Sequence, residues 1–199
     1  TVDGRFQGRS VSASMGPNWD TGDGFTASVQ RVAEQVDGAF TLADSLPVPA
    51  GRYSTDQVSL RGSTGGRRPW ALSVSLAAGD LYGGDLLRYG GSLTLAPTPS
   101  FAFTTGFDRN AVELPSGEFT ADVTSLRLTW ALSTRMTTNA LLQYNGLTDE
   151  WLTNVRFNFI HRPGSDLFVV FTEDRFRDGP DWFTEDRGLV VKLTYLFRF

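Results

Sequence analysis

Hydrophobic and polar residues alternate along most of this chain with a period of two. Residues 123–132 place Leu126 and its even-numbered neighbours on one side, and Arg127 and its odd-numbered neighbours on the other. Residues 153–160 and 187–199 repeat the alternation. Because successive side chains of a β-strand point to opposite faces, the pattern predicts strands with one apolar and one polar face.

About eleven segments follow this rule, and turn-forming residues such as Gly, Pro and Asp separate them. The predicted strands cover residues 5–15, 24–35, 52–63, 69–79, 86–96, 100–109, 119–133, 136–145, 151–162, 166–175 and 187–199. The connections alternate between short ones, at 20–24, 64–68, 96–99, 133–135 and 163–165, and longer ones, at 36–51, 80–85, 110–118, 146–150 and 176–186.

Alternating short and long connections are typical of an up-and-down membrane barrel, whose periplasmic turns are short and whose extracellular loops are long. We therefore expect an all-β, antiparallel, up-and-down transmembrane β-barrel of about 10–12 strands. Residues 1–199 would form one such domain. Single-chain bacterial barrels normally have an even number of strands. An odd count therefore indicates either that one strand is miscounted or that the chain is the C-terminal part of a larger barrel.

The apolar faces of these strands have two interpretations. In a membrane barrel they meet lipid, and aromatic side chains gather near the strand ends at the two interfaces. In a β-sandwich the same side chains point into a core. The aromatic residues near predicted strand ends are Trp70, Phe101, Phe119, Tyr144, Trp151, Tyr195, Phe197 and Phe199. We favour the membrane interpretation, because a sandwich gives no reason for alternating connection lengths.

Composition narrows the class of protein. The chain has 199 residues, a net charge of −4 and 40% hydrophobic residues, as a folded domain has. It contains no cysteine, which excludes disulfides and thiolate metal sites. Its mild acidity argues against a nucleic-acid partner, which requires a clustered basic face. No apolar run approaches the ~20 residues of a membrane-spanning helix.

The polar face of the predicted barrel would line its lumen. The lumen residues predicted there are Arg61, Arg88, Arg127, Arg156 and Lys192, and Glu173 is expected to join them near the outer end. Arginines at similar depth favour the passage of anionic solutes. Alternatively, they pair with carboxylates and stiffen the wall, which is the more ordinary arrangement in small barrels.

The chain offers little for catalysis. His161 is its one histidine and lies at a predicted turn near Ser165, with no feature that marks this serine as a nucleophile. Neighbouring carboxylates such as Glu173 and Asp174 point to opposite faces of a strand. We therefore predict no catalytic, cofactor-binding or metal-binding residues and no enzyme activity. The acidic residues of the predicted loops are expected to be solvated rather than bound to divalent cations.

Several stretches carry a family resemblance: Pro47–Tyr53, residues 77–85, 106–120 and 190–199, and above all 141–174. They resemble a C-terminal outer-membrane β-barrel domain of unknown function, found in bacterial proteins that carry a family 9-like carbohydrate-binding module at the N-terminus. The resemblance covers roughly residues 24–199. It implies a barrel and transfers no catalytic residue, and the carbohydrate-binding module has no counterpart here.

The last strand also resembles the assembly signal of outer-membrane proteins. Lys192, Thr194, Phe197 and Phe199 fit that signal, with Thr194 where glycine is usual. Such a strand presents unpaired backbone groups to the assembly machinery.

Taken together, these features predict a porin-like protein of the Gram-negative outer membrane, acting as a pore or transport-related channel. A non-conducting structural or anchoring barrel that binds a partner protein is the alternative, and an outer-membrane hydrolase is a third. The expected partners are outer-membrane lipid, lipopolysaccharide, the barrel assembly machinery and other protein subunits, with no cofactor.

Overall fold

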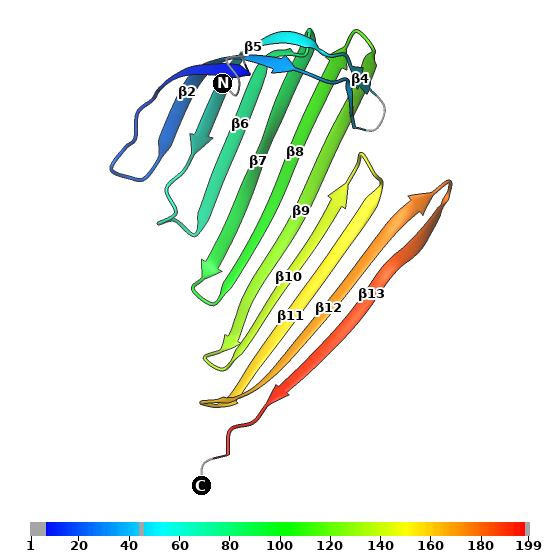
Figure 1. Cartoon of the computed structure of the whole chain (residues 1–199). Helices are drawn as coiled ribbons and strands as arrows, with labels where there is room; N and C mark the ends of the chain where they lie inside the picture. Colours follow the sequence, from blue (N-terminus) through cyan, green and yellow to red (C-terminus); the bar gives the residue numbers. More distant parts are fainter. Residues whose placement is uncertain (1–6, 44–45, 198–199) are drawn as a thin grey trace. The chain divides into compact units, whose positions relative to one another are not determined.

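The structure is a computed structural model that describes residues 7–43 and 46–197. Eleven strands form one antiparallel sheet in the order β1-β2-β5-β6-β7-β8-β9-β10-β11-β12-β13 (Figure 1). These strands are β1 (Gly8–Met15), β2 (Gly24–Val36), β5 (Gly51–Ser63), β6 (Trp70–Leu81), β7 (Gly84–Thr98), β8 (Phe101–Leu114), β9 (Gly117–Ser133), β10 (Met136–Asn145), β11 (Glu150–Arg162), β12 (Ser165–Asp178) and β13 (Asp181–Thr194). A second sheet pairs β3 (Phe40–Leu42) with β4 (Leu46–Val48).

The predicted fold class is confirmed: the protein is all-β, with an antiparallel up-and-down sheet whose strand count lies within the expected range. Each of the eleven predicted segments overlaps one strand of this sheet. Within the part of the chain that the structure describes, no helix is long and apolar enough to cross a membrane.

The expected alternation of connection lengths is wrong. Residues 82–83, 115–116 and 179–180 alone separate strands that we expected longer loops to join. The strands extend into the expected loops 80–85, 110–118 and 176–186, which contain many charged residues. They can do so because backbone pairing does not require alternating side chains. Tyr82 and Gly83, with φ of 49° and 82°, supply the two left-handed residues of a tight hairpin turn.

Contacts divide the chain into two compact units, which are described separately. Unit 1 comprises the described residues of 1–65, 73–91 and 108–121, and unit 2 comprises the described residues of 66–72, 92–107 and 122–199. For each strand, the turn end is the end that leads to connection 16–23, 64–69, 99–100, 134–135 or 163–164. The loop end is the opposite end.

In unit 1, register sorts the side chains into two faces. Val29 pairs with Val58, and Ala27 pairs with Leu60, which in turn pairs with Leu76 on β6. The apolar face so formed comprises Val11, Ala13, Met15, Phe25, Ala27, Val29, Val58, Leu60, Val74, Leu76 and Ala78. The polar face carries Ser10, Ser12, Ser14, Thr26, Ser28, Gln30, Gln57, Ser59, Arg61, Ser73 and Ser75.

Unit 2 shows the same segregation. Its apolar face comprises Leu126, Leu128, Trp130, Ala140, Leu142, Val155, Phe157, Phe159, Leu167, Val169, Phe171, Leu189, Val191 and Leu193. These side chains stay open to the surroundings: Trp130 is 44% exposed and Leu193 74%. The neighbouring positions form the polar face, which nevertheless carries Phe168, Val170 and Val190 near the edge strand β13.

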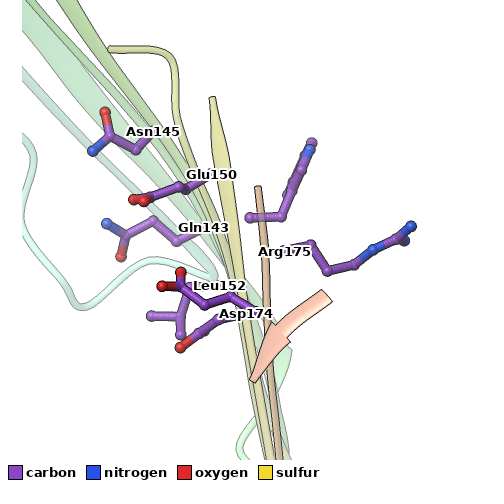
Figure 2. Close-up of a pocket in the computed structure, with 8 residues that line it drawn as sticks. Gln143, Asn145, Glu150, Leu152, Asp174 and Arg175 are labelled. Atoms are coloured by element: carbon purple, nitrogen blue, oxygen red, sulfur yellow. The ribbon is translucent and has the colours of Figure 1, made fainter. Parts of the chain in front are cut away.

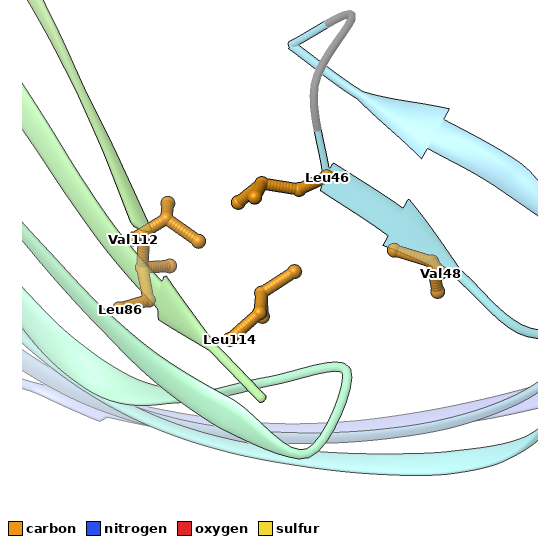
Figure 3. Close-up of a cluster of buried hydrophobic side chains, with 5 residues drawn as sticks. All are labelled: Leu46, Val48, Leu86, Val112 and Leu114. Carbon is orange, nitrogen blue, oxygen red and sulfur yellow. The ribbon is translucent and has the colours of Figure 1, made fainter. Parts of the chain in front are cut away.

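The fully buried hydrophobic residues gather around the β3–β4 hairpin, which the sequence pattern did not reveal. Leu46 and Val48 on β4 pack with Leu86, Val112 and Leu114 in unit 1, and each of the five is at most 6% exposed (Figure 3). Burying each such side chain contributes about 1.5–3 kcal/mol. The hairpin is therefore a packed element within the expected loop 36–51.

The hairpin lies on the polar side of the sheet in unit 1. Leu86 shares a strand face with Arg88, which lines a cavity together with the polar-face residues Ser59 and Ser75. Phe119, which we expected in an interfacial girdle, instead packs against this hairpin cluster. Burial in the same cluster raises the pKa of Tyr82. No second sheet among the described residues covers the apolar face, so the β-sandwich alternative is excluded.

Replacing Val48 by Asp should release the hairpin while leaving the eleven-stranded sheet intact. An unpaired carboxylate in this cluster costs several kcal/mol, more than the packing of one valine supplies. We expect faster protease cleavage between residues 37 and 50 and unchanged strand content by circular dichroism. Thr41→Asp, at an exposed position of the same hairpin, is the control. Equal cleavage rates in the two variants would contradict the packing of the hairpin.

Candidate functional site

The polar face of unit 1 contains a cavity of about 410 Å³, lined from β2, β5, β6 and β7. It brings together Arg61 and Arg88, two of the predicted lumen residues. The other lining residues are Thr26, Ser28, Gln57, Ser59, Leu60, Ser75, Leu76 and Ala77. The Ser28 and Ser59 hydroxyls are hydrogen-bonded to each other at 2.6 Å.

The other three predicted lumen residues lie in unit 2. Arg127 pairs with Leu141, Arg156 with Asn139, and Lys192 with Phe168, which places all three cations on the polar face of this unit. Arg156 Nε donates a hydrogen bond to Asn154 Oδ1 at 3.0 Å. The structure places these three residues on one face of the unit. That this face lines a lumen stays a prediction.

A second polar pocket, of about 240 Å³, lies near the loop ends of β10, β11 and β12 in unit 2 (Figure 2). Gln143, Glu150, Asp174 and Arg175 are among the residues that line it, and the Arg175 side chain points away from Gln143 and Glu150 in Figure 2. Asp174 also faces Asp186 directly across the strand pair, which places like charges together. Among the described residues no group of three His, Cys, Asp or Glu side chains is arranged to hold a metal ion.

Glu173 does not join the lumen residues, which corrects the sequence-based expectation. It pairs across the sheet with Thr153 and Arg187 on the apolar face of unit 2, and its carboxylate forms an ion pair with Arg187. The residue is two positions from Phe171, at the loop-end side of the apolar side chains. Strand β12 is apolar on both faces at its centre, so its pattern alone did not decide which face Glu173 occupies.

Unit 1 has a matching ion pair on its apolar face. Arg31 and Asp56 lie directly opposite each other on β2 and β5, with Arg31 Nη2 2.5 Å from Asp56 Oδ2. They follow Val29 and Val58 towards the loop end. In each unit, therefore, a cross-strand ion pair ends the run of apolar side chains on the loop-end side.

Aromatic pairs also occur near both ends of the strands in unit 2. Phe101 and Trp130 make an edge-to-face contact at 6.3 Å near the turn ends, and Tyr144 and Trp151 lie 4.9 Å apart near the loop ends. Trp70, at the start of β6, lies under the guanidinium of Arg68 at 5.3 Å.

Ser165 has a structural environment rather than that of a nucleophile. It is 2% exposed, and its hydroxyl accepts hydrogen bonds from Leu196 N at 3.0 Å and Arg162 Nε at 3.3 Å. Arg162 Nη2 also donates to Leu196 O at 2.9 Å, and the guanidinium stacks over Tyr195 at 4.3 Å. These contacts attach the segment after β13 to the 163–164 turn. His161 is exposed, with its ring near Phe159.

The predicted assembly signal is described in part. Lys192 and Thr194 lie on β13, and Phe197 lies beyond the strand, its ring 4.7 Å from that of Tyr195. Phe199 lies outside the described residues. The role of these residues in assembly stays a prediction. The Arg162–Ser165 attachment was not anticipated, because the turn residues around it carry no periodic pattern.

Comparisons with known proteins add one structural likeness. No protein-family model matches the chain, and no curated protein sequence does. Among solved structures, the chain is similar to "KdgM porin in complex with disordered oligogalacturonate", with 10% sequence identity and a TM-score of 0.37. The match covers 95% of this chain and 92% of the porin chain. At this identity and TM-score the likeness supports no inference about this protein.

Removing the Ser165 hydroxyl should loosen the C-terminal segment. Ser165→Ala deletes the acceptor of the Leu196 amide, which costs roughly 1 kcal/mol of unfolding free energy. Urea unfolding in detergent micelles, followed by tryptophan fluorescence, measures the loss, and hydrogen exchange at Leu196 locates it. Ser12→Ala, at an exposed position, should stay within about 0.5 kcal/mol of the parent. Unchanged exchange at Leu196 in Ser165→Ala would refute the attachment.

Proposed function

We propose that this chain forms a transmembrane β-barrel, or the C-terminal portion of one, in the bacterial outer membrane and acts as a pore or transport-related channel. One observation carries the proposal: the sheet exposes a face on which apolar side chains are contiguous and carries hydroxyl, amide and arginine side chains on the other. In unit 1, Val11, Val29 and Val58 are each 53% exposed. Soluble monomers rarely expose contiguous apolar surface of this kind, whereas lipid requires it.

The dimensions of the strands agree with a membrane span. A transmembrane strand needs about 9–11 residues at a tilt of about 45°, and β2 to β13 in the main sheet contain between 10 and 17. On β13 the apolar face runs from Leu189 to Leu193 and reaches Tyr195, roughly 20 Å along the strand at 3.3 Å per residue.

The ion pairs that end the apolar faces on the loop-end side also support a membrane location. The ion pairs Arg31–Asp56 and Glu173–Arg187 lie where a strand would leave hydrocarbon, since a charge near an interface is tolerated and one at the midplane costs about 2–4 kcal/mol. Hydrocarbon tolerates no unpaired sheet edge. Closure of the sheet, by its own edge strands or by further strands, is therefore part of the proposal.

The composition of the polar face supports the proposal of a pore. Serine, threonine, asparagine and arginine side chains there are suited to water and would be unsuited to a dry core. The alternative is a non-conducting structural or anchoring barrel that binds a partner protein, and the β3–β4 hairpin on the polar side favours it. An outer-membrane hydrolase has less support, because the hydroxyl of Ser165 is engaged by Leu196 and Arg162.

The partners implied by this location are outer-membrane lipid and lipopolysaccharide, the barrel assembly machinery and other protein subunits. Lys192 and Thr194 on β13, with Phe197 beyond the strand, support the assembly machinery as a partner. The resemblance to barrel domains that follow a family 9-like carbohydrate-binding module belongs to the same proposal. It adds no residue to the site.

Single cysteines on neighbouring positions should report lipid on one face and water on the other. The chain contains no cysteine, so Leu60→Cys, Ser59→Cys, Val191→Cys and Lys192→Cys each carry one spin label. We expect labels at 60 and 191 to collide with oxygen dissolved in lipid, and labels at 59 and 192 with a water-soluble nickel chelate. Electron paramagnetic resonance saturation in liposomes measures both. Equal accessibility within each adjacent pair would contradict the membrane barrel.

Conductance separates the pore from the non-conducting barrel. Protein folded in detergent and added to a planar bilayer should give discrete current steps, since a wet polar lumen carries ions. Buffer with detergent alone and heat-unfolded protein are the controls. Absence of steps from protein whose spin labels show the two-faced pattern would refute the channel and leave the anchoring barrel.

A further inference from the structure

The cavity that contains Arg61 and Arg88 owes its space to small residues. Arg61 lies on β5 and Arg88 on β7, and strand β6 stands between them in the sheet. The residues of β6 that line the cavity from the polar face are Ser75 and Ala77, which leave room between the two long arginine side chains. The opening of about 410 Å³ is within the range of sites for small molecules.

Both arginines that line this cavity lack a protein partner. Among the described residues neither Arg61 nor Arg88 forms a hydrogen bond or an ion pair, and no carboxylate lines the cavity. On the apolar faces, by contrast, Arg31 is paired with Asp56 and Arg187 with Glu173. The expectation that lumen arginines pair with carboxylates therefore finds no support at these two positions. Two unpaired cations sharing a cavity attract an anion.

The side chains around the two arginines determine which chemical groups a ligand of this cavity would carry. Guanidinium forks bind planar carboxylates through two parallel hydrogen bonds. Ser28, Ser59 and Thr26 add hydroxyls and Gln57 adds an amide, groups that both donate to and accept from ligand hydroxyls. The apolar contribution is small, because Leu60 and Leu76 belong to the opposite face.

The β3–β4 hairpin packs on the same strand face as Arg88, towards the loop end of β7. Leu86, which packs against Leu46 and Val48, precedes Arg88 by two positions on the same face of β7. Side chains so spaced lie about 7 Å apart along a strand. A solute arriving from the loop end would pass the hairpin before it meets Arg88.

We propose that the Arg61–Arg88 cavity is a binding subsite for a carboxylated, hydroxyl-rich solute, the chemistry of a sugar acid. The inference rests on the proposed function, because it makes this subsite part of the path of a channel. Arg61 and Arg88 bind the carboxylate, while Ser28, Ser59 and Gln57 bind hydroxyls. The solute class follows from two unpaired guanidiniums together with a hydroxyl-lined wall.

The test compares three probes on the full chain folded in detergent micelles: D-glucuronate, D-glucose and inorganic phosphate, by isothermal titration calorimetry. We expect glucuronate to bind at least about tenfold more tightly than glucose, as the loss of one charge-assisted hydrogen bond implies. Equal affinity for phosphate and glucuronate would overturn the hydroxyl part of the proposal. Equal affinity for glucuronate and glucose would overturn the carboxylate part.

The variants Arg61→Gln and Arg88→Gln should each weaken glucuronate binding about tenfold. Arg127→Gln, which removes a polar-face arginine outside this cavity, should leave it unchanged. Circular dichroism and heat-modified gel mobility confirm that each variant folds, and Arg61→Lys should recover part of the affinity through its charge. Unchanged binding in both glutamine variants, or an equal loss in Arg127→Gln, would refute the site.

Binding in micelles does not depend on conduction, so the two proposals fail separately. Glucuronate binding without current steps would reject the channel and keep the subsite. Current steps without selective glucuronate binding would keep the channel and reject the subsite. If both hold, added glucuronate should reduce the current through the parent protein more than through Arg61→Gln.

Discussion

The pairing of neighbouring strands at a fixed antiparallel register is the constraint on which the other features of this protein depend. Side chains alternate between faces with a period of two, so a slip of one residue would move Val58, Leu60 and Leu76 to the polar side and Arg61 to the apolar side. Register therefore sets which residues share the apolar face and which share the polar face. The same pairing carries the strands through charged stretches and reduces most of the expected loops to tight turns.

This constraint leaves the sheet with an unusual distribution of hydrophobic contacts. A soluble fold hides its apolar face, whereas here that face is open and the buried cluster lies on the other side, between the β3–β4 hairpin and strands β7 and β8. Backbone pairing holds the sheet, the hairpin stabilises its loop-end region in unit 1, and Arg162 with Ser165 attaches the chain after β13 in unit 2. The proposed membrane location accounts for the apolar face that stays open.

The charges follow the same division. Cross-strand ion pairs occur on the apolar faces, and each charge there is neutralised by its partner on the next strand. The cavity arginines lie on the polar face, where water or a solute can neutralise them. Acidic side chains gather in the pocket of unit 2 near the loop ends, with Asp174 opposite Asp186. Segregation of charge by face thus connects the sheet to its proposed role in passing or binding polar solutes.

The pattern of the sequence was enough to predict the fold class, the eleven strands of the main sheet and the residues that share a face on most of them, because a two-residue period is a local property. It also placed Arg127, Arg156 and Lys192 on polar positions of their strands. The folded structure was needed for everything that depends on contacts between residues far apart in the chain. It paired Glu173 with Arg187, because β12 is apolar on both faces and only its register with β13 assigns them. It turned the 36–51 loop into a packed hairpin, because three-residue strands show no readable period. It also joined Arg61 and Arg88 in one cavity, since only the pairing of β5, β6 and β7 brings them together.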